Sequence, residues 1–125
     1  MPELTFGQYI RSLRLRAGLG LRRFAEMIPM KPSNLCRTEA GRIPPPRDAH
    51  VIRRIAEALG IKETSPEYVQ LNDLASKARP GTIAPDVSEY VASQPGVPLL
   101  LRTARGKHLD AEQLRQLVEY IEAHL

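Results

Sequence analysis

The chain has 125 residues, of which 42% are hydrophobic, and a formal net charge of +4 at pH 7. That length fits one compact domain, or a small domain with an extension. No apolar run approaches the roughly 18 residues that a membrane span needs, and the N-terminus lacks a signal-peptide pattern. The single cysteine, Cys36, cannot form an internal disulfide, so the composition excludes a disulfide scaffold and favours a cytoplasmic protein.

The charge is distributed unevenly along the chain. Residues 1–62 contain 12 Lys and Arg against 5 Asp and Glu, whereas the remainder contains 6 against 9. A basic half joined to an acidic half predicts one surface for a polyanion and another surface for a different partner. The alternative is a solvated charged surface that binds nothing.

Three short helices are predicted at the start of the chain, over residues 6–17, 21–28 and 32–39. Apolar residues recur in them at the helical spacing, and no stretch alternates like a strand. Gly18 ends the first helix, and Pro29 ends the second because its ring removes a backbone donor. The side chains expected to face the core are Phe6, Ile10, Leu13, Ala17, Leu21, Phe24, Ala25, Ile28 and Leu35.

Two further helices complete a predicted all-α domain of five helices, residues 1–79. Residues 43–47 form a stiff, extended connection to a fourth helix that starts at Asp48 and stops at Gly60. Ser65 caps a fifth helix that continues to the end of this domain. The inward residues expected in the fourth helix are Ile52, Ile55, Ala56 and Leu59.

Residues 80–125 are predicted to form a helical C-terminal extension after a linker over residues 79–85. Two short helical pieces precede a last helix, which begins at Asp110 with Gln113 completing a capping box. One face of this last helix is apolar, and we expect it to bind a second copy of the chain or a different protein. The residues of that face are Leu114, Leu117, Val118, Ile121 and Leu125.

Two short helices joined by a tight turn have the geometry of a helix-turn-helix that reads DNA. The second helix must present small or hydrogen-bonding side chains, because it enters a major groove about 12 Å wide. The outward side chains near residues 32–39 meet this demand, and Leu35 points back to the core. We expect Arg22 and Arg23 to contact phosphates. The outward residues are Lys31, Ser33, Asn34, Cys36 and Arg37.

Residues 17–42, AGLGLRRFAEMIPMKPSNLCRTEAGR, resemble the helix-turn-helix of the Xre/Cro family, the lambda-repressor-like domains. The resemblance covers roughly residues 5–62, about half of the chain, and residues 86–125 look more loosely like the tails of such regulators. The marks that carry it are Gly18, Leu19, Phe24, Ala25, Glu26, Ser33, Leu35, Arg37, Glu39, Gly41, Arg42 and Pro45.

The resemblance implies a role for individual residues. Pro32, Ser33 and Arg37 occupy positions that meet bases, and an arginine there can donate a bidentate pair to guanine. Arg14 and Glu39 occupy the positions of a partly buried ion pair that ties the first helix to the third. The positions that grip phosphates are those of Lys31, Ala40 and Arg42.

Three departures from the family pattern concern the same motif. Gly20 and Leu21 stand where the second helix usually begins with Ser or Thr followed by Gln, so a phosphate contact is lost or replaced. Pro29 takes the place of a glycine, and we expect a local change of the turn because proline cannot adopt a positive φ. Pro32 lacks the side-chain hydrogen bonds that a glutamine would supply.

These observations predict a homodimeric transcriptional repressor that binds double-stranded DNA at a pseudo-palindromic site. An alternative is an antitoxin-like module whose residues 86–125 bind a partner protein, with DNA binding serving autoregulation. A third reading is a domain that has lost DNA binding. The sequence offers no arrangement of catalytic residues, no cofactor motif and no metal-ligand spacing among its three histidines, so we expect no enzyme.

Overall fold

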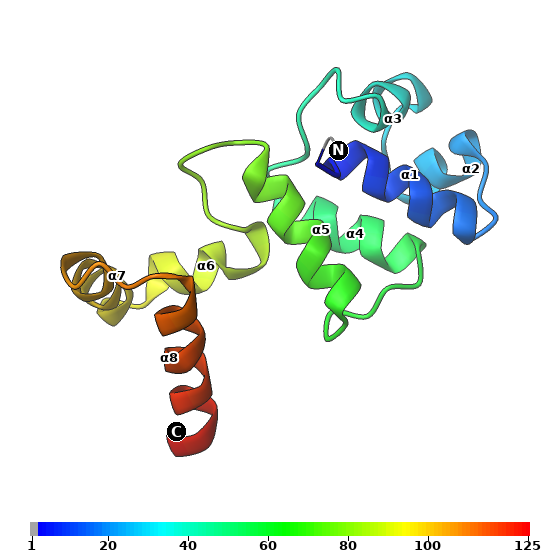
Figure 1. The fold of residues 1–125 in the computed structure, drawn as a ribbon. Coiled ribbons are helices and arrows are strands. Elements are labelled where there is room, and N and C mark those ends of the chain that lie inside the picture. Colours follow the sequence, from blue (N-terminus) through cyan, green and yellow to red (C-terminus); the bar gives the residue numbers. More distant parts are fainter. Residues whose placement is uncertain (1–2) are drawn as a thin grey trace. The chain divides into compact units, whose positions relative to one another are not determined.

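The structure, a computed structural model, describes residues 3–125, so the first two residues of the predicted N-terminal domain lie outside it. The described residues form eight helices and no strand, which confirms the all-α prediction (Figure 1). The helices are α1 (Phe6–Arg16), α2 (Leu21–Met27), α3 (Pro32–Glu39), α4 (Ala49–Ala58), α5 (Pro66–Lys77), α6 (Pro85–Ser93), α7 (Gly96–Gly106) and α8 (Ala111–His124). They divide into two compact units, one ending at Ser88 and the other comprising residues 89–125.

The core of the first unit is built by α1 to α5. α1 packs against α3 and α5, α2 against α3 and α4, and α4 against α5. Among the predicted core positions, Ala17 is an error: it is exposed because α1 ends one residue before it. Leu21 and Leu59 are only half-buried at the edge of the core. The buried hydrophobic residues are Phe6, Ile10, Leu13, Phe24, Ala25, Ile28, Leu35, Ile52, Ile55, Ala56, Tyr68, Leu71, Leu74 and Ala75.

The helices of the first unit begin at side chains that satisfy free backbone donors. The Gln8 backbone N–H donates to the Thr5 hydroxyl at 3.1 Å, while the Thr5 N–H donates to the Gln8 side chain at 3.0 Å. Asp48 and Ser65 cap α4 and α5 in the simpler way, each accepting one backbone N–H. A cap of this kind stabilises a helix by about 1 kcal/mol, so these residues fix where each helix starts.

The turn between α2 and α3 contains a backbone conformation that we expected to be forbidden. Pro29 has a φ of +23°, so the expectation that this proline avoids positive φ is wrong. The Met30 N–H donates to the Ala25 carbonyl at 3.1 Å, which closes the turn in the way that glycine-terminated helices close. Ile28, which precedes the proline, is buried in the core. Hydrogen bonding and packing on both sides therefore hold Pro29 in a strained conformation.

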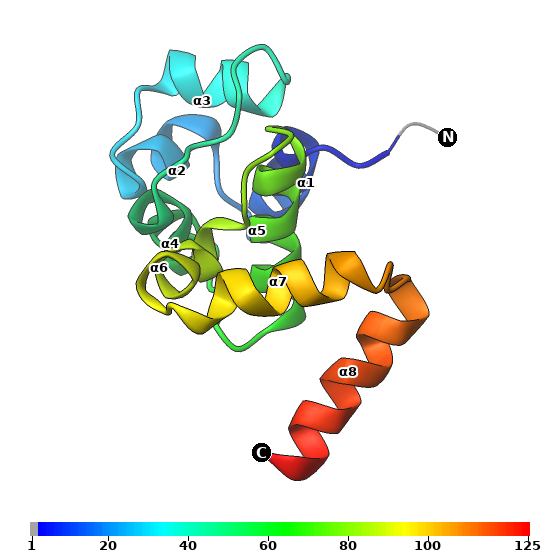
Figure 2. The same cartoon turned by 90° about the vertical axis from the view of Figure 1, so that its left-hand side faces the viewer.

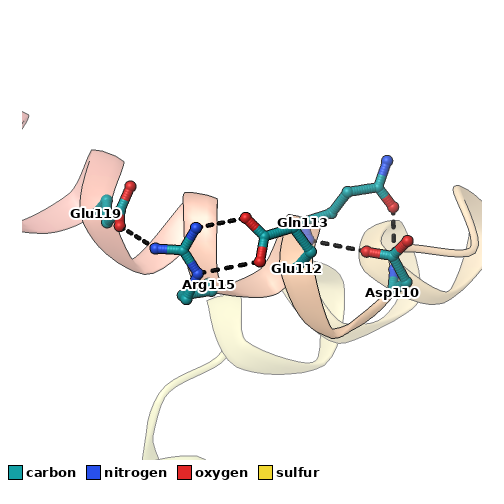
Figure 3. A network of polar contacts seen from close by, with 5 residues as sticks. All are labelled: Asp110, Glu112, Gln113, Arg115 and Glu119. Carbon is teal, nitrogen blue, oxygen red and sulfur yellow. Dashed lines mark hydrogen bonds and ion pairs between the residues drawn. The ribbon is translucent and has the colours of Figure 1, made fainter.

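The second unit contains α7 and α8 without a core of its own. Neither helix has a buried residue. α8 leaves the end of α7 and turns away instead of folding back along it (Figure 2). The predicted capping box between Asp110 and Gln113 begins α8, and Arg115 bridges Glu112 and Glu119 along its surface (Figure 3). This helix is ordered by its own local contacts, not by tertiary packing.

Candidate nucleic-acid interface

α3 has one face in the core and one face in solvent. Leu35 is completely buried, and Thr38 and Glu39 are buried beside it. Asn34 is half-buried at the edge, where its backbone carbonyl accepts the Thr38 hydroxyl at 2.8 Å. The remaining arc of the helix is exposed and consists of the other four residues expected to read bases. These are Pro32, Ser33, Cys36 and Arg37.

A buried ion pair fixes the C-terminal end of α3 to α1. Arg14 donates from Nε and from one terminal nitrogen to the two carboxylate oxygens of Glu39, at 2.8 and 2.9 Å. Its other terminal nitrogen donates to the Leu19 carbonyl at 3.0 Å, which ties in the connection from α1 to α2. The hydrogen bonds that Arg14 donates to the Glu39 carboxylate raise the pKa of Arg14 above its ordinary value. One guanidinium thus holds three segments of the motif in a fixed geometry.

A glycine on α1 allows α3 to approach closely. A Cβ built on Gly7 would lie 2.1 Å from the Thr38 carbonyl oxygen and 2.7 Å from that of Glu39. No side chain fits at such distances, so only glycine lets the two backbones meet here. Together with the ion pair and Leu35, this contact sets the position of α3 relative to the rest of the unit. Gly7 is not recognisable from the sequence, since a helical glycine carries no signal of its long-range neighbour.

Several basic side chains of the helix-turn-helix have no acidic partner. Among the described residues, four of the expected DNA contacts are in no ion pair, namely Arg22, Lys31, Arg37 and Arg42. Arg23 lies 3.7 Å from Glu26, and both side chains are 70% exposed. Water screens such an exposed pair, so it does not fix the Arg23 side chain. Ala40 is exposed directly after α3. The motif therefore presents unneutralised positive charge next to a polar helix face.

The start of α2 agrees with the departure noted in the sequence. Gly20 precedes the helix without any side-chain capping bond, and Leu21 packs against the core. Neither residue offers a polar side chain to a phosphate. Arg22, one position further on, is exposed and carries a positive charge.

Residues 5–65 match the model of the helix-turn-helix domain family. The matched segment, just under half of the chain, comprises α1 to α4 and includes every residue expected to contact DNA. A match to a helix-turn-helix domain supports a DNA-binding regulator, and α3 lies within the matched segment. Neither a curated protein nor a solved structure matches the chain.

Three further features of the described residues bear on other kinds of site. Residues 3–125 contain no group of three or more His, Cys, Asp or Glu side chains that could hold a metal ion. None of their helices is long and apolar enough to cross a membrane. The apolar residues expected at an interface lie on α8, where Leu117 is half-buried and the other four are exposed.

Proposed function

We propose that the protein is a cytoplasmic transcriptional repressor of the Xre/Cro type that binds double-stranded DNA as a dimer. The observation that carries this proposal is the exposed polar face of α3, fixed to α1 by the Arg14–Glu39 pair and flanked by unpaired cations. A helix held so rigidly can enter a major groove in one orientation. A solvated charged surface has no need of a preorganised helix.

Different side chains serve affinity and discrimination in this proposal. Arg22, Lys31 and Arg42 contact phosphates, with Arg23 and the backbone at Ala40 beside them, and this makes binding sensitive to salt. Arg37 donates a bidentate pair to a guanine, which discriminates by about 1–3 kcal/mol against other bases. Pro32, Ser33, Asn34 and Cys36 complete the base-reading face by shape and by single hydrogen bonds. Two copies then occupy successive major grooves about 34 Å apart.

Fluorescence anisotropy across a salt series tests this proposal, with a DNA fragment selected from a random library and a scrambled fragment. Wild type is expected to prefer the selected fragment, and Arg37→Ala to lose about 1–3 kcal/mol of that preference. Arg42→Ala is expected to weaken binding to both DNA fragments and to lower by about 1 the slope of log affinity against log salt concentration. Equal, weak binding of both fragments by wild type and Arg37→Ala would contradict the proposal.

Lys62→Ala is the matched control for these variants, because it also removes one positive charge. Lys62 is exposed in the turn between α4 and α5. That turn lies at the opposite end of the first unit from α3 in both views (Figures 1 and 2). We expect this variant to keep the preference and the salt slope of wild type.

A second candidate function follows from the exposed apolar face of α8. An antitoxin-like protein uses such a face to cover a different protein and binds DNA only to regulate its own synthesis. A stoichiometric partner that co-purifies with wild type and is lost with Ile121→Asp would favour this function. A chain that purifies alone and binds DNA favours the repressor.

A further inference from the structure

α8 presents an apolar face that its own unit does not cover. Val118 and Leu125 are 52% and 93% exposed, and Leu114 and Ile121 are exposed beside them. α7 has a similar excess of exposed apolar residues, since Leu99, Leu100 and Leu101 are all about half exposed or more. A unit of fewer than about 40 residues cannot bury enough surface alone, and association is a usual remedy.

The two helices carry opposite charges. α7 and its C-cap contain Arg102, Arg105 and Lys107 and no acidic residue. α8 and its N-cap contain Asp110, Glu112, Glu119 and Glu122 against the single base Arg115. Among the described residues none of the three α7 cations is in an ion pair, and neither is Glu122.

The local network on α8 determines which acidic groups are left for a partner. Arg115 is taken by Glu112 and Glu119, which leaves one excess negative charge in that cluster (Figure 3). Glu122 follows Ile121 on the same helix and lies next to the apolar face, one turn after Val118. α8 therefore carries an excess of negative charge, and Glu122 at the edge of its apolar face is the acidic group left for a basic partner.

We propose that the second unit is a self-complementary dimerisation element, in which α8 of one copy packs against α7 of a second copy. Leu114, Val118 and Ile121 meet the leucines of α7, while Glu122, at the edge of that face, lies opposite Arg102 and Arg105 across the contact. A two-fold axis repeats the contact, so that α7 of each copy packs against α8 of the other. A single arrangement thereby covers both apolar faces and neutralises both charge excesses.

This inference deepens the proposed function, because it names the partner that brings two reading helices to one DNA site. A dimer without DNA would hold α3 of each copy on a common assembly before binding. The two claims have separate measurements: the oligomeric state is determined without DNA, and DNA preference is determined by anisotropy. A dimer that ignores DNA would refute the proposed function and leave this inference intact.

Charge reversal followed by mixing tests the pairing between copies. One full-length variant carries Arg102→Glu and Arg105→Glu, so both its helices are acidic. The other carries Glu119→Lys and Glu122→Lys, so both are basic. Sedimentation equilibrium is expected to show each variant alone dimerising at least about tenfold more weakly than wild type, because like charges now meet. An equimolar mixture is expected to recover dimers, since every contact between unlike chains is then attractive.

Mixing distinguishes contacts between copies from contacts within one chain. If α7 attracted only the α8 of its own chain, each variant would be impaired and mixing would restore nothing. Ile121→Asp provides the apolar counterpart and is expected to give a monomer whose far-ultraviolet spectrum is that of wild type. A monomeric wild type at high concentration, or a mixture no better than its components, overturns the proposal.

Discussion

Replacing Pro29 by glycine is expected to stabilise the protein. Pro29 ends α2 at a φ of +23°, whereas Gly18 and Gly41 occupy the equivalent places after α1 and α3 at +74° and +76°. Both glycines also donate their N–H to a carbonyl three residues earlier, at 3.1 Å. A proline has no such donor, so the carbonyl of Glu26 lacks this bond at the end of α2.

The size of the effect follows from three contributions. Relief of backbone strain is worth about 1–3 kcal/mol, and the recovered hydrogen bond adds about 1 kcal/mol. Glycine makes the unfolded chain more flexible than proline does, and this opposes the gain by about 1–2 kcal/mol. We therefore expect Pro29→Gly to raise the free energy of unfolding by about 1 kcal/mol, which for a domain of this size raises Tm by roughly 4–8 °C.

Thermal and urea unfolding, followed by far-ultraviolet circular dichroism, measures this change. Pro44→Gly is the matched control, since Pro44 lies exposed in the loop before α4 and has no positive φ. It is expected to lose about 1 kcal/mol through the unfolded chain alone. If Pro29→Gly destabilises the protein as much as Pro44→Gly does, the strain assigned to this turn does not exist.

Three other substitutions test how α3 is held against α1 and what a buried polar group costs in the core. Gly7→Ala is expected to lower the free energy of unfolding by about 3 kcal/mol or more, because its methyl group would meet two carbonyls of α3. Gly20→Ser is the control and is expected to be tolerated, since there is open space at the Cβ of residue 20. Equal urea midpoints for the two variants would contradict the close contact. Glu39→Gln is expected to cost about 3–5 kcal/mol by leaving Arg14 without its charged partner. Replacing both Arg14 and Glu39 by methionine should recover most of this loss in urea unfolding, and no recovery would show that the pair itself supplies the stability. Asn72→Leu is expected to raise the unfolding free energy by about 1–2 kcal/mol, because the buried Asn72 side-chain oxygen has no hydrogen-bond partner among the described residues; a lowered Tm would refute that assignment.

Local signals in the sequence were sufficient to place the helices. Thr5, Asp48, Ser65 and Asp110 each precede an apolar helical repeat, and each caps a helix in the structure. A cap and a period of 3.6 residues act over a few positions, so no tertiary information is needed to read them. The orientation of Leu35 toward the core was predictable for the same reason.

Contacts between distant residues were not predictable from such signals. Gly7 is an ordinary helical glycine in the sequence, and its role depends on carbonyls more than thirty residues away. The Arg14–Glu39 pair was expected only because the chain resembles a known family, since the two residues share no periodicity. The positive φ of Pro29 was not predictable either, because the steric preference of proline is local, whereas the hydrogen bond and the packing that oppose it are set by the fold around it.

The central claim is that the exposed face of α3 reads bases, and selection from a random DNA library followed by sequencing tests it most directly. The experiment compares wild type with Arg37→Ala and with Lys62→Ala. We expect wild type to enrich a two-fold motif, Lys62→Ala to enrich the same motif, and Arg37→Ala to lose the preference at one symmetric pair of positions only. Enrichment of one identical motif by all three proteins, or of none by wild type, would contradict the claim that α3 is the reading helix.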